Sequence, residues 1–203
     1  MFKSVVMMVF SVLVLSGCAS VRLVDTDVRS FVTPPGVTAG AAYRFERLPS
    51  QQASAAQARL ETLAQVALGK VGLMRKDTEA GYSVQVTYSL RVDPYAPWEQ
   101  PFGGRAGLSL SLGLGMRSGH LGLASGRPLM PGFGWGESPY YWREVSLVIR
   151  HLASGQVVYE TQGAHDGRWS DSGAVLPAML DAALMDFPNP PRGPRRIGLE
   201  IPR

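Results

Sequence analysis

The chain has 203 residues, of which 45% are hydrophobic, and this is enough for one domain with a proper hydrophobic core. Its single cysteine excludes a scaffold held together by internal disulfides, so the stability of the fold must come from that core. The formal net charge of +4 is modest, and it fits either attraction to anionic partners such as lipid phosphates or plain solubility.

The first residues have the pattern of an export signal. Lys3 is followed by an apolar run over residues 5–15, which only Ser11 interrupts. A charged start and a short apolar stretch are typical of a secretion signal, and the run is too short to span a bilayer as a helix. We therefore expect residues 1–17 to be removed as a signal peptide.

The end of this signal carries the strongest motif in the chain. Leu15, Ser16, Gly17 and Cys18 resemble the lipobox, in which small residues precede a cysteine whose thiol receives a diacylglycerol. The motif predicts cleavage between Gly17 and Cys18 and lipidation of Cys18; an ordinary signal peptide with an incidental cysteine is the alternative. Bacterial lipoproteins usually carry three acyl chains, and each buried methylene contributes about 0.8 kcal/mol, so such an anchor is effectively permanent.

The residues after the cysteine indicate the destination. Ala19 and Ser20 follow it, and the lack of an aspartate there resembles lipoproteins that are forwarded to the outer membrane. We expect a protein that is lipid-anchored to the outer membrane and faces the periplasm, with the membrane as its first partner.

The chain after the anchor begins with two predicted strands and a helix. Apolar, partly alternating residues predict a strand over 21–28, and a Pro- and Gly-containing turn follows at 33–36. A second strand is predicted over Ala42–Leu48. Ser50 is then the expected N-cap of a helix that runs to about Lys70.

This helix has one apolar stripe at three-and-four spacing, which predicts a buried face, and the stripe consists of Leu60, Leu63, Ala64, Ala67, Leu68 and Val71. The next segment, Tyr82–Val92, alternates apolar and polar residues more regularly than any other part of the chain. It predicts a strand with one dry and one wet face.

Residues 94–141 form a predicted insertion between strands, rich in glycine, proline and aromatic residues, and longer than most connections in compact domains. Aromatic side chains are enriched in contact surfaces, so we expect those of the insertion and its edge to bind a partner. The alternative is a small hydrophobic core that covers the sheet. The candidate residues are Trp98, Phe102, Phe133, Trp135, Tyr140, Tyr141 and Trp142.

Regular structure is predicted to resume with a β-hairpin formed by Arg143–Leu152 and Val157–Thr161. Apolar residues at helical spacing then predict a second helix over Leu176–Phe187. Pro177 fits that helix only in its first turn, and Pro188 ends it.

A proline- and arginine-rich tail is expected over residues 188–203, with 197–201 as a possible short last strand. The tail contains Arg192, Arg195, Arg196 and Arg203, a basic group that suits either lipid phosphate or a solvated terminus.

The order of these elements predicts an α/β (α+β) two-layer sandwich, in which a mixed β-sheet carries both helices on one face. The first helix can serve as a right-handed crossover between two parallel strands.

Several segments together resemble a known family. They are the run 43–49 that leads into an alanine-rich helix, the strand 82–92, and the hairpin and helix that close on residues 186–188. With the lipobox, they look like the bacterial lipoproteins of the domain of unknown function 4136, over most of residues 19–190. The family has no established reaction, so the resemblance implies fold and location only.

Residue patterns for catalysis and cofactors are weak. The three histidines, His120, His151 and His165, are scattered without metal-ligand spacing, so we expect no metal and no other cofactor. Gly113, Gly115 and Gly119 have the wrong spacing for a nucleotide fingerprint, and nothing predicts nucleic acid as a partner.

One constellation imitates a hydrolase: His165, Asp166 and Asp171, with Ser170 or Ser172 nearby, but without the Gly-x-Ser-x-Gly elbow. The leading hypothesis is therefore a non-catalytic lipoprotein that binds or scaffolds another envelope protein or an anionic envelope component through the insertion. A periplasmic hydrolase that uses this constellation is the alternative.

Overall fold

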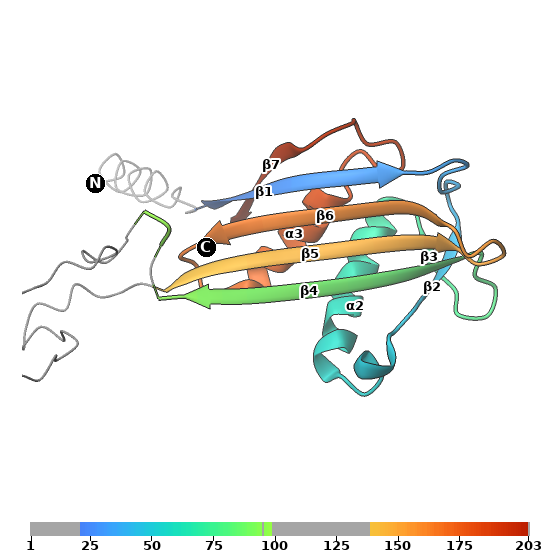
Figure 1. Ribbon diagram of the computed structural model, residues 1–203, viewed down its shortest axis with the longest axis horizontal. Coiled ribbons are helices and arrows are strands. Elements are labelled where there is room, and N and C mark those ends of the chain that lie inside the picture. The colour runs from blue at the N-terminus through green and yellow to red at the C-terminus, as the bar shows by residue number, and fades with distance from the viewer. Residues whose placement is uncertain (1–20, 95, 99–138, 203) are drawn as a thin grey trace, which may run out of the picture.

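The computed structural model describes residues 21–94, 96–98 and 139–202. These residues form a seven-stranded mixed sheet with two α-helices on one face, which confirms the predicted two-layer α/β sandwich (Figure 1). The elements in chain order are β1 (Val21–Val32), β2 (Ala42–Phe45), the 3-10 turn η1 (Pro49–Gln51), α2 (Ala55–Lys70), β3 (Met74–Arg75), β4 (Tyr82–Asp93), β5 (Tyr140–His151), β6 (Val157–Gly167), α3 (Ser172–Ala183) and β7 (Arg195–Pro202).

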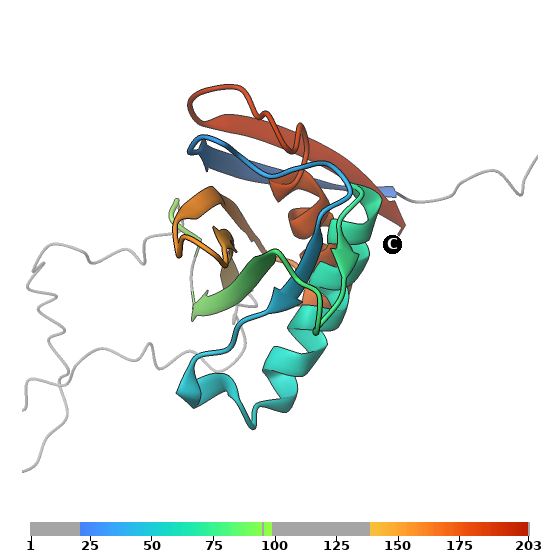
Figure 2. The ribbon, with the colours of Figure 1, turned by 90° about the vertical axis from the view of Figure 1, so that its right-hand side faces the viewer.

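The strands are arranged in the order β3-β2-β4-β5-β6-β1-β7. β2 is parallel to β3 and β4, and all other neighbours are antiparallel. The predicted crossover between parallel strands is confirmed, because α2 lies in the chain between β2 and the strands β3 and β4, which are both parallel to β2. Both helices lie on the same side of the sheet (Figure 2).

The hydrophobic core lies between this side of the sheet and the helices. Val86 and Ile149 of the sheet are fully buried there against Leu68 of α2 and Leu180 of α3. The other side of the sheet, here called the helix-free face, carries mainly polar residues. In β1, for example, buried and exposed residues alternate from Val21 to Ser30.

Both helices begin at residues other than those expected. The 3-10 turn η1 begins at Pro49 and precedes α2. The N-cap of α2 is Ser54, whose hydroxyl accepts a hydrogen bond from Gln57 N at 3.2 Å. α3 is capped by Asp171, which accepts from Ala174 N at 3.1 Å. Pro177 therefore lies in the second turn and not in the first, where its missing N–H would remove no hydrogen bond.

Two of the strands that extend beyond their predicted bounds, β5 and β6, include residues that had been placed outside strands. β5 begins at Tyr140, so the insertion ends before that residue, because a run of aromatic residues favours a strand. β6 extends to Gly167 and includes His165 and Asp166.

The last strand, β7, is confirmed, and it incorporates part of the predicted basic tail. Arg196 forms a two-pronged ion pair with Asp27 of β1, at 2.9 and 3.1 Å. This arginine is therefore part of the sheet, not of a free tail.

Candidate partner-binding site

The candidate site lies where β4 ends and β5 begins, on either side of residues 99–138. Four of the seven aromatic residues expected to bind a partner are described here: Trp98, Tyr140, Tyr141 and Trp142. Phe102, Phe133 and Trp135 lie outside the described residues.

Three of the four form a continuous row, which we call the aromatic ladder: Trp98, Tyr140 and Trp142. The rings of Trp98 and Tyr140 meet edge to face at 5.4 Å, and those of Tyr140 and Trp142 at 5.3 Å. Such edge-to-face pairs are stabilising beyond the area they bury. Tyr140 and Trp142 are two residues apart in one strand, so both lie on the helix-free face.

Hydrogen bonds hold two of the three rings in place, those of Tyr140 and Trp142. Trp142 Nε1 donates to Asp93 Oδ2 at 2.8 Å, and the Tyr140 hydroxyl donates to the carboxylate of Asp166. Burial, and then the hydrogen bond to Asp166 and its charge, raise the pKa of Tyr140 to about 12. The phenol therefore remains a donor throughout the physiological range.

A cation covers one end of the ladder. The guanidinium of Arg91 lies 5.1 Å from the centre of the Trp142 ring and 3.3 Å from Asp93. Its charge is thereby paired, and the guanidinium covers the indole ring. Tyr140 is buried, whereas Trp98 is 68% exposed, so the ladder has a fixed base and one indole that faces solvent.

Tyr141 does not belong to the ladder, because it points to the opposite side of β5. The Arg143 guanidinium lies 5.0 Å from the centre of its ring and is only 2% exposed. Arg143 also donates to Ser172 Oγ at 3.1 Å and to the backbone oxygen of Trp169. This arginine therefore holds the chain in front of α3, which is a structural role.

Sequence reasoning did not assign Arg91, Asp93 and Asp166 to this site. Arg91 had been placed on the wet face of its strand, and the register of β4 against β5 puts it directly opposite Trp142. Asp166 is opposite Trp142 on the other side. The missing information was the start of β5, since without it no cross-strand neighbour is defined.

The residues of the hydrolase hypothesis are not brought together. His165 and Asp166 are consecutive in β6 and point to opposite faces of the sheet. His165 is buried on the helix side, where Nδ1 contacts the backbone oxygen of Asp25 at 2.7 Å. Asp171 caps α3 and lies 3.7 Å from Arg22. Among the described residues, no hydrogen bond or ion pair joins His165 to either aspartate.

The remaining histidines, metal-ligand clusters and membrane-spanning helices can be checked in the same way. His151 contacts Ser154 Oγ at 3.1 Å, and His120 lies outside the described residues. No group of three or more His, Cys, Asp or Glu side chains that could hold a metal occurs in the described ranges. Within the same ranges, no helix has the length and apolarity to cross a bilayer.

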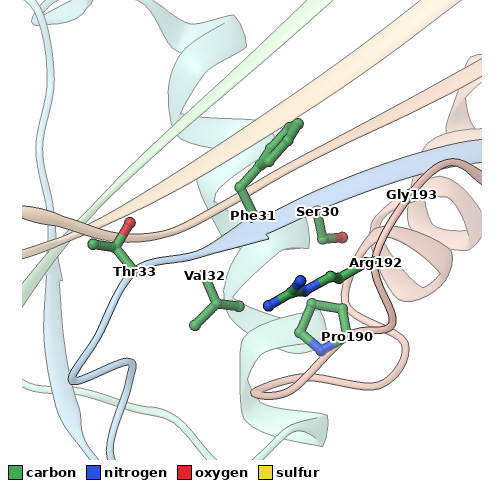
Figure 3. Close-up of a pocket in the computed structure, with 7 residues that line it drawn as sticks. All are labelled: Ser30, Phe31, Val32, Thr33, Pro190, Arg192 and Gly193. Carbon is green, nitrogen blue, oxygen red and sulfur yellow. The ribbon is translucent and has the colours of Figure 1, made fainter.

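Two larger depressions mark the described surface away from the ladder. One, of about 600 Å³, lies between the first turns of α2 and α3 and is lined in part by Leu60, Tyr88 and Ser172. The other, of about 580 Å³, lies beside the loop before β7, and Figure 3 shows the Arg192 side chain between Val32 and Pro190. Neither is lined by a histidine or a carboxylate.

Comparison with known proteins gives similarities of fold at low identity. No protein-family model and no curated protein matches the chain. Among solved structures, the PelC dodecamer from Paraburkholderia phytofirmans is 12% identical over 81% of this chain and 99% of that chain, with a TM-score of 0.46. A variant of that dodecamer is 13% identical over 78% and 94%, with a TM-score of 0.44.

A PDZ domain protein from Parabacteroides distasonis is also similar, at 16% identity and a TM-score of 0.49. The match covers 89% of this chain but only 39% of that protein, so the present chain spans well under half of its length. Similarities at this level do not identify a family.

Proposed function

We propose that this protein is a lipid-anchored envelope protein of the outer membrane that binds or scaffolds another envelope component without catalysing a reaction. The observation that carries the proposal is the aromatic ladder. Hydrogen bonds hold Tyr140 and Trp142 in place, while Trp98 is 68% exposed. The resemblance to the lipoproteins of the domain of unknown function 4136 agrees with this proposal and stays a prediction.

The ladder has the properties of a binding surface that is ready before the partner arrives. Its rings have few rotatable bonds, and two of the three are already fixed, so little conformational entropy is lost on binding. Tryptophan is enriched among residues that dominate binding energy, and truncating such a residue typically costs about 2 kcal/mol or more of affinity. The paired charge of Arg91 adds a polar group beside the rings, as at the edge of a typical interface.

The anchor is supported by the position of the fold relative to the lipobox. β1 begins at Val21, three residues after Cys18, so a lipid on that cysteine would hold the domain close to the membrane. We expect Cys18→Ser to abolish labelling of the protein by a radioactive fatty acid and to leave the precursor uncleaved. Normal labelling of this variant would contradict the anchor.

In-cell photo-crosslinking tests the binding surface. A photoreactive residue at the position of Ser89, an exposed residue two places from Arg91 on the same side of β4, should form an adduct with an envelope component. Trp98→Ala should remove this adduct, because it removes the exposed rung.

Phe31→Ala is the matched control, since Phe31 is 60% exposed at the opposite end of the sheet. It should leave the adduct unchanged. An adduct that survives Trp98→Ala, or the absence of any adduct at Ser89 in intact cells, would refute the role of the ladder.

A further inference from the structure

Further exposed apolar side chains lie at the end of the sheet that also carries the aromatic ladder. Five of them, which we call the strand-end rim, are between 43% and 55% exposed: Val21, Leu23, Leu90, Val92 and Trp169. Branched aliphatic side chains and the ring of a tryptophan are apolar, and several of them exposed at one end of the sheet favour a contact surface there.

The rim residues come from β1, from β4 and from the chain after β6, which share this end. Val21 and Leu23 lie on the helix-free face, and Leu90 and Val92 lie on the other side. β1 begins here with Val21, which pairs with Pro202 at the end of β7. Val92 stands near the end of β4 and pairs with Tyr141 at the start of β5. Trp169 follows β6, which ends at Gly167. In Figure 1 this end is on the left, where the described chain begins and the C-terminus lies.

The covalent length of the chain limits how far this end can be from a membrane. Only Ala19 and Ser20 separate Cys18 from Val21. Three residues span at most about 11 Å, whatever their conformation. The headgroup layer on one side of a bilayer is about 5–8 Å thick, so a lipid on Cys18 would hold the rim at or next to that layer.

The chemistry of the rim fits this boundary. The Trp169 ring lies 5.0 Å from the Arg22 guanidinium, which in turn is 3.7 Å from Asp171. Tryptophan is enriched at membrane interfaces, because its large ring is apolar and its N–H is polar. Arg91 beside the rim is also paired, with Asp93 at 3.3 Å. These charges are balanced, so they give no strong preference for anionic lipid.

We infer that the strand-end rim is the membrane-contacting surface of the protein, and that its occupant is the headgroup layer of a phospholipid bilayer. The inference rests on the lipid anchor of the proposed function and adds an orientation: the sheet stands with this end on the bilayer. Burial of apolar side chains drives the contact, and salt and lipid charge have little influence on it.

A vesicle experiment tests the rim independently of cellular lipidation. The chain from residue 18 onward contains every described element, and Cys18 is its only thiol. Coupling that thiol to a maleimide phospholipid in phosphatidylethanolamine and phosphatidylglycerol vesicles places the tether at the proposed residue. A polarity-sensitive fluorescent amino acid is placed at the position of Leu23 or of Val92.

The control position is Phe31, which lies in the same strand and on the same face as Leu23, about 27 Å away along the strand. On coupling, the reporters at Leu23 and Val92 should shift to shorter emission wavelengths and become protected from acrylamide quenching. The reporter at Phe31 should not change. High salt, or vesicles without phosphatidylglycerol, should give the same result.

Three outcomes would overturn the inference. Rim reporters that keep their aqueous emission after coupling would show that the rim does not touch lipid. A response that appears only with phosphatidylglycerol at low salt would make the contact electrostatic. Rim reporters shielded before coupling would show that residues 99–138 or a second copy occupy the rim, and dilution separates these two occupants. Failure of the anchor would instead appear as missing lipid labelling of Cys18 in cells, which this experiment does not use.

Discussion

The two halves of β4 have the same sequence pattern and different surroundings. In the first half, Val84 and Val86 are fully buried beneath the helices. In the second half, Leu90 and Val92 continue the alternation on the same side but are 45% and 49% exposed. Alternation therefore reports which way a side chain points, and only the tertiary structure decides whether another element covers it.

The sharpest way to break this comparison is to place the same charge in both halves. Val86→Asp would bury a carboxylate with no partner, and we expect it to destabilise the fold by about 4 kcal/mol or more. Val92→Asp places the charge on the same side of the same strand at the exposed end, and its effect should stay within about 0.5 kcal/mol.

Urea denaturation followed by circular dichroism measures both variants. Leu180→Asp, in the buried face of α3, should behave like the change at Val86. Equal destabilisation by the changes at Val86 and Val92 would show that the strand end is as covered as the middle of the sheet.

The same contrast explains how far the sequence predicted the fold. Periodicity was sufficient for both helices and for the hairpin, because each of them buries one regular face. The order of these elements then predicted the parallel crossover. Periodicity was insufficient for the helix starts. Ser50 and Ser54 are both suitable N-caps by residue type, and the 3-10 turn that begins at Pro49 contains Ser50, so the helix starts after Ser54.

The candidate site was predictable in part for a related reason. Aromatic composition identified Trp98, Tyr140 and Trp142, but it also included Tyr141, which faces the other way. The error came from treating Tyr140–Trp142 as loop, since only a strand separates neighbouring residues onto opposite faces. No sequence signal showed that Leu90 and Val92 would remain uncovered.

A second prediction concerns the link between the helix layer and the sheet. Glu61 of α2 is buried and forms a two-pronged ion pair with Arg47, at 2.7 and 2.6 Å. Gln57 Nε2 donates to Glu61 and to the backbone oxygen of Val86. Burial alone would raise the pKa of Glu61, but the hydrogen bonds from Arg47 and Gln57 and the charge of Arg47 together hold it below its ordinary value of 4.5.

Because this pKa is lowered on folding, the pair stabilises the fold above the ordinary value and loses that effect as the pH falls through the folded pKa. Glu61→Gln should cost about 1–2 kcal/mol at neutral pH, since Arg47 is partly exposed and screened. The difference from the unchanged protein should shrink as the pH falls below 4.5.

Unfolding free energies between neutral pH and pH 3 test this prediction. Glu79→Gln is the control, because its ion pair with Lys76 is exposed and should contribute almost nothing. A difference for Glu61→Gln that does not depend on pH would mean that packing, not charge, explains its effect.

A third prediction concerns the fixed base of the ladder. Tyr140→Phe removes the hydrogen bond to Asp166 and should cost about 1 kcal/mol, in line with a single hydrogen bond at a partly solvated site. The raised pKa of Tyr140 means that this contribution is complete below its ordinary value of 10.0 and is lost as the pH rises through about 12.

Thermal unfolding and spectroscopic titration of the tyrosines measure these effects. Tyr88→Phe provides the comparison, since its hydroxyl contacts Ser172 Oγ at a longer 3.4 Å and should matter less. If both changes had the same effect, the Asp166 bond would not be the feature that fixes the ladder.

The smallest expected effect on stability comes from the largest change in sequence. Asp93 pairs directly with Tyr140, so the ends of β4 and β5 are already adjacent and need only a short connection. Each halving of a loop changes its closure entropy by only about 0.6 kcal/mol. Replacing residues 99–138 with a short Gly/Ser loop, with Trp98 retained, should therefore leave the unfolding free energy nearly unchanged or slightly higher.

The same variant decides what Phe102, Phe133 and Trp135 contribute. If they form a hydrophobic core over the sheet, their removal would expose apolar surface and lower the melting temperature by many degrees. If they belong to the partner-binding surface, melting should hold while the adduct from the Ser89 position weakens or disappears. An unchanged adduct with unchanged melting would assign the partner contact to the ladder alone, because the variant keeps Trp98, Tyr140 and Trp142 at this end of the sheet and lacks the other three candidates.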